Sequence, residues 1–228
     1  LYEQGKITYM RTDSVNLSQD ALDAAENQIT KLYGQEYSQR RTYSKKAKGA
    51  QEAHEAIRPS YMENKHVEGD SSHQKLYDLI WKRTIASQMS NAQTNQNSLQ
   101  IECEEQNITL KATLGKLIFD GYKKVYNLQE DDEEQIISLL DNLKENDKYK
   151  VDNVEVLESF TSPPSRYTDA SLVKKLEELE IGRPSTYASI ISVISNRGYA
   201  DIVNKRFFPT DRGKLISAFL EKLFSKYV

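Results

Sequence analysis

Cysteine is almost absent from this sequence, since Cys103 is the only one in 228 residues. A single cysteine cannot form a disulfide within the chain, and no Cys/His spacing typical of a zinc site is present. Disulfide-stapled scaffolds and zinc modules are therefore excluded, and the composition suits a reducing cytosol. Long hydrophobic runs are absent too: no apolar stretch approaches the roughly 18 residues that a membrane-spanning helix needs, so we expect no membrane partner.

Proline and glycine are scarce, with five and nine residues, while 38% of the residues are hydrophobic. Such a chain can bury a core, and its length allows one or two domains. The sequence begins at Leu1 within what looks like a continuing sequence pattern. We therefore expect a piece of a longer protein, in which case targeting information would be absent.

The formal net charge is only −3, yet the charges are segregated along the chain. Counting Lys and Arg against Asp and Glu, residues 1–93 carry +1, residues 94–162 carry −8 and residues 163–228 carry +4. This pattern suggests that only the two ends meet a polyanion, although a random scatter of solvated charges would look similar.

Two amphipathic helices are predicted before residue 90. The first covers residues 19–33, with Ser18 as its N-cap and Gly34 as its stop. Its apolar face would consist of Leu22, Ala25, Ile29 and Leu32. The second covers about residues 71–89. It would place on one side Leu76, Leu79, Ile80, Arg83 and Ile85, with Trp81 flanking them.

From about residue 97 onward apolar and polar residues alternate, a pattern typical of half-buried antiparallel strands. Strands are predicted in SLQIECEE, NITLKATLG, KLIFDGYKKVYNL and KYKVDNVEVLESF, all between residues 98 and 160. The next stretch, TSPPSRYTDA, reads as a linker because its prolines cannot continue a strand ladder.

The C-terminal part is predicted to alternate helices and a hairpin. Helices over about 169–180 and 184–196 flank a break at Gly182-Arg183-Pro184. Two short strands, YADIVN and KRFFPTD, and a last helix follow. Helix, tight turn, helix and β-hairpin is the order of a winged helix-turn-helix, which binds DNA.

Three short motifs carry candidate chemistry, and the first is ITYMRTDS, residues 7–14. In a strand Tyr9 and Arg11 would point the same way. A tyrosine hydroxyl, with a pKa near about 10, needs electrostatic support to act as a nucleophile. A guanidinium two residues away could bind the phosphate under attack, which suits phosphoryl transfer. Tyrosine and arginine also alternate in ordinary edge strands, so the pair alone leaves both interpretations open.

The second motif is QEAHEAIRPS, residues 51–60. As a helical turn ended by Pro59, it would set His54 and Arg58 four residues apart on one side. The alternative is a solvated helix whose histidine has no role.

The third motif is GRPSTYASII, residues 182–191. With Pro184 at the first helical position, free backbone N–H groups and the hydroxyls of Ser185 and Thr186 would suit a phosphate, with Arg183 beside them. An ordinary capped helix start remains the alternative.

In this order and at these distances, the three motifs resemble the type IA DNA topoisomerases, and the resemblance runs through essentially all 228 residues. Met10 between Tyr9 and Arg11 resembles the bacterial topoisomerase I branch, since the topoisomerase III branch usually has proline there. The resemblance implies a multidomain α+β fold that is part of a toroidal enzyme. Residues 1–93 would be a helical active-site-tyrosine domain, residues 94–162 an antiparallel β arch, and residues 163–228 a winged-helix-like DNA-binding base.

The resemblance also implies roles for single residues. Tyr9 would attack single-stranded DNA and become joined to the 5′ phosphate, a second strand would pass, and the break would be resealed. Negatively supercoiled DNA is relaxed in this way without ATP. Arg11 would stabilise the scissile phosphate, and we expect Tyr9 to be partly exposed with His54 folded back towards it. The DNA-binding residues would be His54, Arg58, Arg183, Ser185 and Thr186.

In the family, the Mg²⁺ site belongs to a toprim domain that precedes the residues seen here, so we expect no metal site in this chain and no activity from it alone. The resemblance implies single-stranded or negatively supercoiled DNA as the partner, a monomer, and a place in the bacterial cytoplasm with the nucleoid. Two alternatives stay open. Tyrosine recombinases and type IB enzymes also combine a tyrosine with basic residues, but there the tyrosine normally comes last. The isolated chain could also be a non-catalytic module that binds single-stranded DNA.

Overall fold

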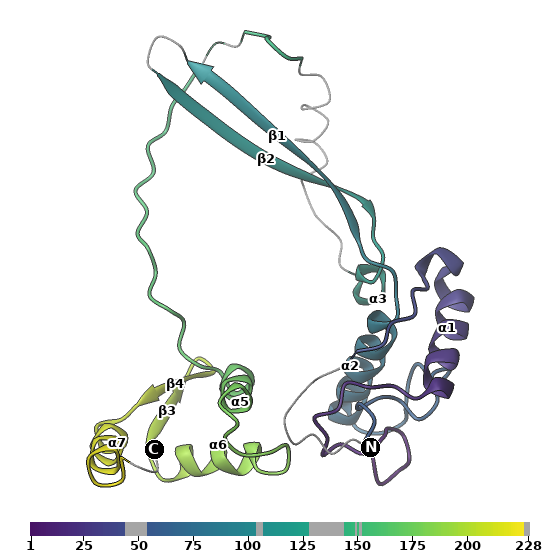
Figure 1. The fold of residues 1–228 in the computed structure, drawn as a ribbon, viewed down its shortest axis with the longest axis vertical. Coiled ribbons are helices and arrows are strands. Elements are labelled where there is room, and N and C mark those ends of the chain that lie inside the picture. Colours follow the sequence, from purple (N-terminus) through teal and green to yellow (C-terminus); the bar gives the residue numbers. More distant parts are fainter. Residues whose placement is uncertain (44–53, 104–106, 128–143, 149, 151, 226–228) are drawn as a thin grey trace. The chain divides into compact units, whose positions relative to one another are not determined.

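The computed structural model describes residues 1–43, 54–103, 107–127, 144–148, 150 and 152–225. Its elements are drawn in Figure 1 and make a mixed α+β fold, as predicted. The chain divides into two compact units, Leu1–Val151 and Asp152–Val228. The division into three domains stays a prediction. Of the helices in the described ranges, none is long and apolar enough to span a membrane.

Helix α1 (Gln19–Tyr33) has the bounds that the sequence predicts. Ser18 caps it, because its Oγ accepts a hydrogen bond from the Ala21 amide at 3.3 Å. Gly34 ends the helix with a φ of 112°, a conformation that favours glycine. Both signals are local, which is why the sequence alone could locate this helix.

The buried face of α1 is shorter than predicted. Leu22, Ala25 and Ile29 are buried as expected, but Leu32 is 44% exposed. The short 3₁₀-helix η1 (Gln35–Tyr37) follows directly, and its Tyr37 is buried in the core cluster. Tyr37 therefore belongs to the core, whereas Leu32 does not.

Helix α2 (Ser71–Ser87) presents a different face to the core from the one predicted. Its buried residues are Tyr77, Trp81, Thr84, Ile85 and Ala86. Leu76 and Leu79 are instead 50% and 60% exposed. Tyr77 and Trp81 lie one turn apart, and burying these two large rings removes more apolar surface from water than burying the leucines would. Aromatic area therefore decides which side of the helix packs.

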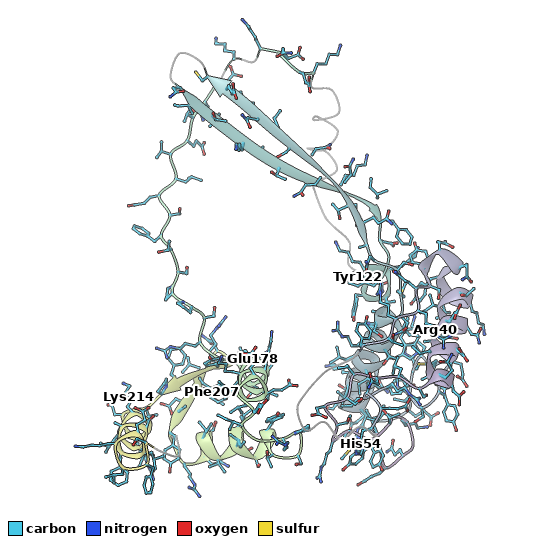
Figure 2. The ribbon with its side chains drawn as sticks, in the orientation of Figure 1. Arg40, His54, Tyr122, Glu178, Phe207 and Lys214 are labelled. Carbon is cyan, nitrogen blue, oxygen red and sulfur yellow. The ribbon has the colours of Figure 1, made fainter. Side chains whose placement is uncertain are left out.

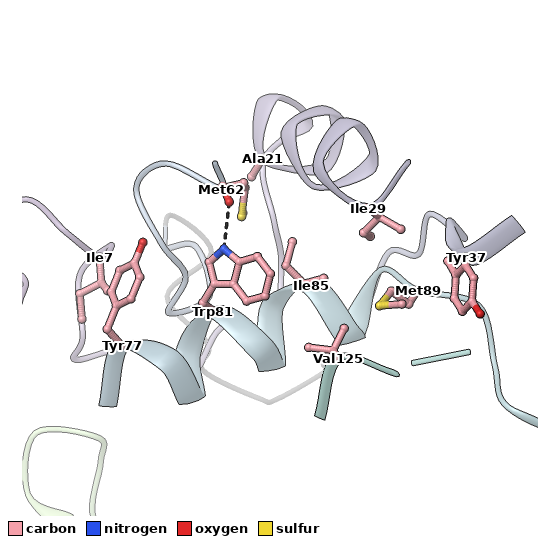
Figure 3. Close-up of a cluster of buried hydrophobic side chains, with 10 residues drawn as sticks. All are labelled: Ile7, Ala21, Ile29, Tyr37, Met62, Tyr77, Trp81, Ile85, Met89 and Val125. Atoms are coloured by element: carbon pink, nitrogen blue, oxygen red, sulfur yellow. Dashed lines mark hydrogen bonds between the residues drawn. The ribbon is translucent and has the colours of Figure 1, made fainter. Parts of the chain in front are cut away.

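The core of the N-terminal unit is built around Trp81 (Figure 3). Its ring is fully buried, and its Nε1 donates a hydrogen bond to the Met62 carbonyl oxygen at 2.9 Å. Ile7 belongs to the same cluster and is only 6% exposed. Because Ile7 precedes Tyr9 by two residues, this packing anchors the start of the first motif.

Strands β1 (Gln93–Cys103) and β2 (Ile108–Phe119) form a two-stranded antiparallel sheet (Figure 1). The antiparallel pairing agrees with the prediction, but the apolar side chains are not half-buried as expected. Leu110 and Ile118 are 56% and 60% exposed. A two-stranded ribbon has no second layer of its own, and the described residues provide none over these side chains.

One predicted strand is half wrong and another is wrong. Residues 116–119 of KLIFDGYKKVYNL belong to β2, but the strand does not continue through the rest of the segment. Helix α3 (Lys123–Tyr126) occupies the second half of KLIFDGYKKVYNL and buries Val125. Residues 152–160, the described end of KYKVDNVEVLESF, lie outside any strand, and their Leu157 is 84% exposed. Alternation in the sequence did not make these segments strands, because strands also need a pairing partner.

The C-terminal unit follows the predicted order of elements. These are α5 (Asp169–Glu178), α6 (Tyr187–Asn196), β3 (Ala200–Val203), β4 (Arg206–Pro209) and α7 (Asp211–Leu223). Strands β3 and β4 pair antiparallel. Thr168 caps α5 through a capping box with Ser171. Among the described residues of this unit only Ala200 and Phe207 are buried, so most of its apolar side chains are exposed.

Candidate active site

Tyr9 lies between two other aromatic residues, with 37% of its surface exposed. Its ring stacks on the imidazole of His54, with the centroids 5.6 Å apart and the planes inclined by 29°. Tyr2 meets the Tyr9 ring edge-on at 5.3 Å and 69°. Figure 2 labels His54 in the N-terminal unit. As expected, His54 folds back onto a partly exposed Tyr9, although 45 residues separate them in the sequence.

Backbone pairing between the first and second motifs holds these rings together. Ile7 and Pro59 form an isolated antiparallel bridge. Beside it, the Thr8 amide donates a hydrogen bond to the Arg58 carbonyl oxygen at 2.9 Å. Residues 8–14 do not continue this bridge as a strand, so the predicted opening strand is wrong. The segment is positioned by one bridge and by side-chain bonds instead of by a regular ladder.

Thr8 supplies the most important of those side-chain bonds. Its Oγ1 accepts a hydrogen bond from the Arg58 amide at 2.9 Å and donates one to the Ala56 carbonyl oxygen at 2.8 Å. Thr8 therefore joins the residue next to Tyr9 to the loop that carries His54. No role for Thr8 was predicted from the sequence, because its partners lie 48 and 50 residues away and no local pattern reveals them.

Arg58 is directed into its own loop. Its Nη2 lies 2.7 Å from Glu55 Oε2, its Nη1 donates to the Pro59 carbonyl oxygen at 2.9 Å, and only 15% of its side chain is exposed. The described part of the second motif, residues 54–60, contains no helix, so the predicted shared helical side for His54 and Arg58 is wrong. Residues 51–53 lie outside the described residues. A contact of Arg58 with DNA stays a prediction.

Glu55 ties the same loop to helix α1. Its Oε1 accepts a hydrogen bond from the amide of Ser18, the N-cap of α1, at 2.6 Å. Burial raises the pKa of Glu55, but the hydrogen bonds from Ser18 and Arg58 outweigh it and hold that pKa below its ordinary value. An ionised Glu55 therefore fixes the loop beside Tyr9, a role that its place in the sequence did not indicate.

Arg11 is exposed and makes no hydrogen bond or ion pair with any other described residue. The turn after it is held by hydroxyl groups. Thr12 Oγ1 accepts from the Ser14 amide at 3.0 Å, and Ser14 Oγ accepts from the Asn16 amide at 3.2 Å. The guanidinium of Arg11 is therefore available to an anion, on the segment that also carries Tyr9.

The third motif lies in the C-terminal unit, and its helix starts later than predicted. Residues 184–186 form a turn, and α6 begins at Tyr187. Thr186 Oγ1 accepts a hydrogen bond from the Arg183 amide at 2.9 Å and donates one to the Arg183 carbonyl oxygen at 3.1 Å. The amides of Thr186 and Tyr187 also donate to that oxygen, so fewer N–H groups are free here than expected. Arg183, Ser185 and Thr186 are all exposed.

A metal site was not expected in this chain. In the part of the chain that the structure describes, no group of three or more His, Cys, Asp or Glu side chains could hold a metal ion.

A family model described as DNA topoisomerase matches residues 1–228. The chain is 47% identical over 231 residues to the DNA topoisomerase 1 of Rickettsia bellii, covering 98% of this chain and 29% of that protein. It is 42% identical to the DNA topoisomerase 1 of Zymomonas mobilis, covering 100% of this chain and 19% of that protein. The chain thus spans less than a third of these relatives.

A solved structure is similar as well. Full-length topoisomerase I from Thermotoga maritima matches with a TM-score of 0.73 and 36% identity, over 96% of this chain and 35% of that one. Together with the family match over the whole length, this confirms the resemblance drawn from the three motifs. The chain belongs to the bacterial DNA topoisomerases of type IA, in the topoisomerase I branch.

Proposed function

We propose that this chain carries the nucleophilic half of a topoisomerase I active site. The whole enzyme would cleave single-stranded DNA, pass a second strand and religate, which relaxes negative supercoils. One observation carries the proposal: Tyr9 is partly exposed and stacked on His54, so two motifs far apart in the sequence meet at one hydroxyl group. A ring held by two aromatic neighbours needs little reorganisation before it attacks.

In the proposed reaction the Tyr9 oxygen attacks phosphorus, forming a phosphorus–oxygen bond while the bond to the 3′ oxygen breaks. The tyrosine gives up its proton, and the departing 3′ oxygen gains one. The products are a 5′-phosphotyrosine and a free 3′ hydroxyl. Since one ester replaces another, religation is the reverse step and needs no ATP. The free guanidinium of Arg11 would bind the non-bridging phosphate oxygens and offset their charge.

We assign the DNA backbone to the exposed groups of the third motif. Arg183 would make the charged contact, with Ser185 and Thr186 as hydroxyl partners. The order of helices and hairpin around them supports a winged-helix-like base. The exposed antiparallel hairpin of β1 and β2 supports a role in the β arch of a toroidal enzyme, where it need not grip DNA.

We place the Mg²⁺ of the enzyme in a toprim domain outside this chain. The described residues do not fit such an ion, because they offer no cluster of carboxylate, histidine or cysteine ligands. What this chain supplies is the nucleophile, a cation beside it and part of the DNA path. We also propose single-stranded or negatively supercoiled DNA as the partner, a monomeric enzyme, and a nucleoid-associated location in the bacterial cytoplasm.

Family membership does not favour the alternatives of a tyrosine recombinase, a type IB enzyme or a binding module without catalysis. The proposal is tested by replacing Tyr9 with Phe in the topoisomerase that contains this chain. Tyr9→Phe removes only the phenolic oxygen, so no covalent complex with labelled single-stranded DNA should be trapped by denaturant. Tyr2→Phe is the matched control and should keep the covalent complex. A covalent complex in Tyr9→Phe would contradict the proposal.

A further inference from the structure

The N-terminal unit contains a pocket of about 640 Å³ that Tyr9 does not line. It opens where the segment after η1 runs beside the C-terminal end of α2, with Ser38 bridged to Met89. Ser14 and Ala56 form part of its wall, and these residues belong to the two motifs that carry Tyr9 and His54. Its volume is within the range of about 300–1,000 Å³ that ligand pockets usually have.

The lining of this pocket is positively charged. Arg41 and Arg83 both line it, and among the described residues of its lining there is no Asp or Glu. The whole chain has more acidic than basic residues, so two arginines and no carboxylate among the described lining residues run against the composition. Two like charges in one concavity raise each other's energy unless an anion binds between them. The pocket therefore favours an anionic ligand.

Arg41 is held in place by neutral groups. Its Nη2 donates to Gln39 Oε1 at 2.6 Å and to Asn91 Oδ1 at 2.7 Å, and its Nη1 reaches the Ser87 carbonyl oxygen at 3.5 Å. Its backbone amide donates at 2.9 Å to the side chain of buried Gln88. These bonds orient the guanidinium without neutralising it. Of its five N–H donors, three are used among the described residues and two remain for a ligand.

Arg83 is exposed, and its side chain makes no hydrogen bond or ion pair with another residue of the described ranges. The residues that precede both pocket arginines in sequence behave differently. Arg40 lies 2.7 Å from Asp23, and Lys82 lies 2.7 Å from Asp78. The neighbouring cations are thus paired with carboxylates, while the two that line the pocket have no carboxylate partner among the described residues.

Two tyrosines complete the lining. Tyr43 is 42% exposed and is anchored by its hydroxyl, which donates to the Ser87 carbonyl oxygen at 2.9 Å. Tyr122, labelled in Figure 2, is 38% exposed at the start of α3. Partly exposed aromatic rings beside cationic groups are what proteins use to bind single-stranded nucleic acid, because every base can stack on a ring while the phosphate meets the cation.

We infer that this pocket binds one nucleotide unit of a single DNA strand, with its phosphate on Arg41 and Arg83 and its base against Tyr43 or Tyr122. The inference rests on the proposed function, since it names where the substrate strand is held away from Tyr9. Because Ser14 and Ala56 connect the pocket wall to the two active-site motifs, a nucleotide seated here would fix the path of the strand that Tyr9 cuts.

The test uses Arg83→Gln and Arg41→Gln, with Lys82→Gln and Arg40→Gln as matched controls. Each control removes one positive charge one residue away, at a side chain that does not line the pocket. Binding of a fluorescent oligothymidylate to the chain is measured by anisotropy at several salt concentrations. Each pocket variant should bind several-fold more weakly, and the slope of log K against log salt should fall by about 0.7, because one phosphate is no longer neutralised. The controls should keep the wild-type slope.

Two further probes separate the parts of the ligand. An abasic oligonucleotide of the same length should bind the wild-type chain roughly tenfold more weakly, because it keeps the phosphates and loses the stacking. Thymidine monophosphate should bind much more weakly than the oligothymidylate. If the mononucleotide binds as tightly, the site takes a free nucleotide and the assignment to a strand is overturned.

An equal weakening in the controls and the pocket variants would also overturn the inference, because the effect would then be net charge alone. Arg41→Gln could loosen the segment it anchors, so Arg83→Gln, whose side chain bonds to no other described residue, decides the matter. Covalent capture by Tyr9 is scored separately in the parent enzyme at saturating DNA. If Tyr9 captures DNA covalently but the pocket does not bind the strand, only this inference is overturned. If the pocket binds the strand but Tyr9 captures no DNA, the proposed function is overturned.

Discussion

The rings of Tyr9 and His54 stack with their centroids 5.6 Å apart, although neither lies in a regular helix or strand. Loops usually carry functional side chains because a packed scaffold can hold them while leaving them open to substrate. Here the scaffold is the core around Trp81, reached through buried Ile7 on one side. On the other side it is the start of α1, reached through Glu55. The position of Tyr9 therefore depends on a few long-range bonds.

Two substitutions of His54 should separate its stacking on Tyr9 from its proposed contact with DNA. His54→Ala removes the ring against which Tyr9 rests, and an aromatic pair is worth about 0.5–1.5 kcal/mol. Covalent-complex formation in the parent enzyme should therefore slow by about threefold to tenfold at saturating DNA. His54→Phe keeps a ring and should retain most of this rate while binding DNA more weakly. Single-turnover capture at several DNA concentrations measures both effects. Equal rates of covalent-complex formation in His54→Ala and wild type would show that the stack does not position Tyr9.

Thr8→Val should loosen the connection between the two motifs. Valine has nearly the same shape but cannot accept from the Arg58 amide or donate to the Ala56 carbonyl oxygen. Leaving these partly buried groups unpaired should lower the free energy of unfolding by about 1–3 kcal/mol, and covalent capture should slow as well. Denaturant unfolding measures the change in the free energy of unfolding. Thr12→Val is the control, because its hydroxyl makes only a local turn bond to the Ser14 amide, and it should cost clearly less.

What the sequence could predict follows from the range of the interactions. Helix α1 was predicted to the residue because Ser18 and Gly34 act locally. The resemblance carried by the three motifs led to the expectation that His54 lies against Tyr9, and the two rings do stack. The buried face predicted for α2 was wrong, because in the sequence Leu76 and Leu79 are as apolar as Trp81 and nothing shows which of them meets another element. Local patterns specify where elements start and stop, while tertiary contacts decide which side packs.

The site shows the same limit. Nothing near Thr8 indicates partners about 50 residues away, and Glu55 looked like one of several charges in its motif. Both residues acquire their roles only in the folded chain. The pocket arginines were missed for the same reason, since Arg41 and Arg83 come from different segments and meet only in the folded unit.

A pair of glycines should respond differently to alanine. Gly121 and Gly5 both have positive φ, 50° and 67°. A Cβ at Gly121 would lie 2.5 Å from the Ser90 carbonyl oxygen, whereas a Cβ at Gly5 would meet nothing within 4 Å. Gly5→Ala should therefore lower the free energy of unfolding by about 1–2 kcal/mol, the cost of holding an alanine in the left-handed backbone conformation. Gly121→Ala should cost clearly more in denaturant unfolding, because backbone must move at the junction of β2 and α3. Equal costs would contradict the close approach.

The Glu55 carboxylate should make the stability of the N-terminal unit depend on pH in a defined direction. Its pKa is lower in the folded protein than the ordinary value of 4.5, because the hydrogen bonds from Ser18 and Arg58 outweigh the burial that would raise it. A carboxylate with a lowered folded-state pKa adds stability at pH values above 4.5 and loses it as the pH falls through the folded-state value. Protonation would weaken the ion pair with Arg58, whose Nη2 lies 2.7 Å away.

Glu55→Gln should therefore destabilise the chain near neutral pH, since glutamine cannot pair ionically with Arg58, and the difference from wild type should shrink as the pH falls below the ordinary glutamate pKa. Denaturant unfolding of both proteins between about pH 7 and about pH 3 measures this, because the change in stability with pH reports the difference in bound protons between the folded and unfolded states. The same change at exposed Glu68 is the control and should leave the pH dependence of wild type intact. A constant gap between Glu55→Gln and wild type across this range would mean that the charge of Glu55 does not hold the loop beside Tyr9, and that its neutral hydrogen bonds do.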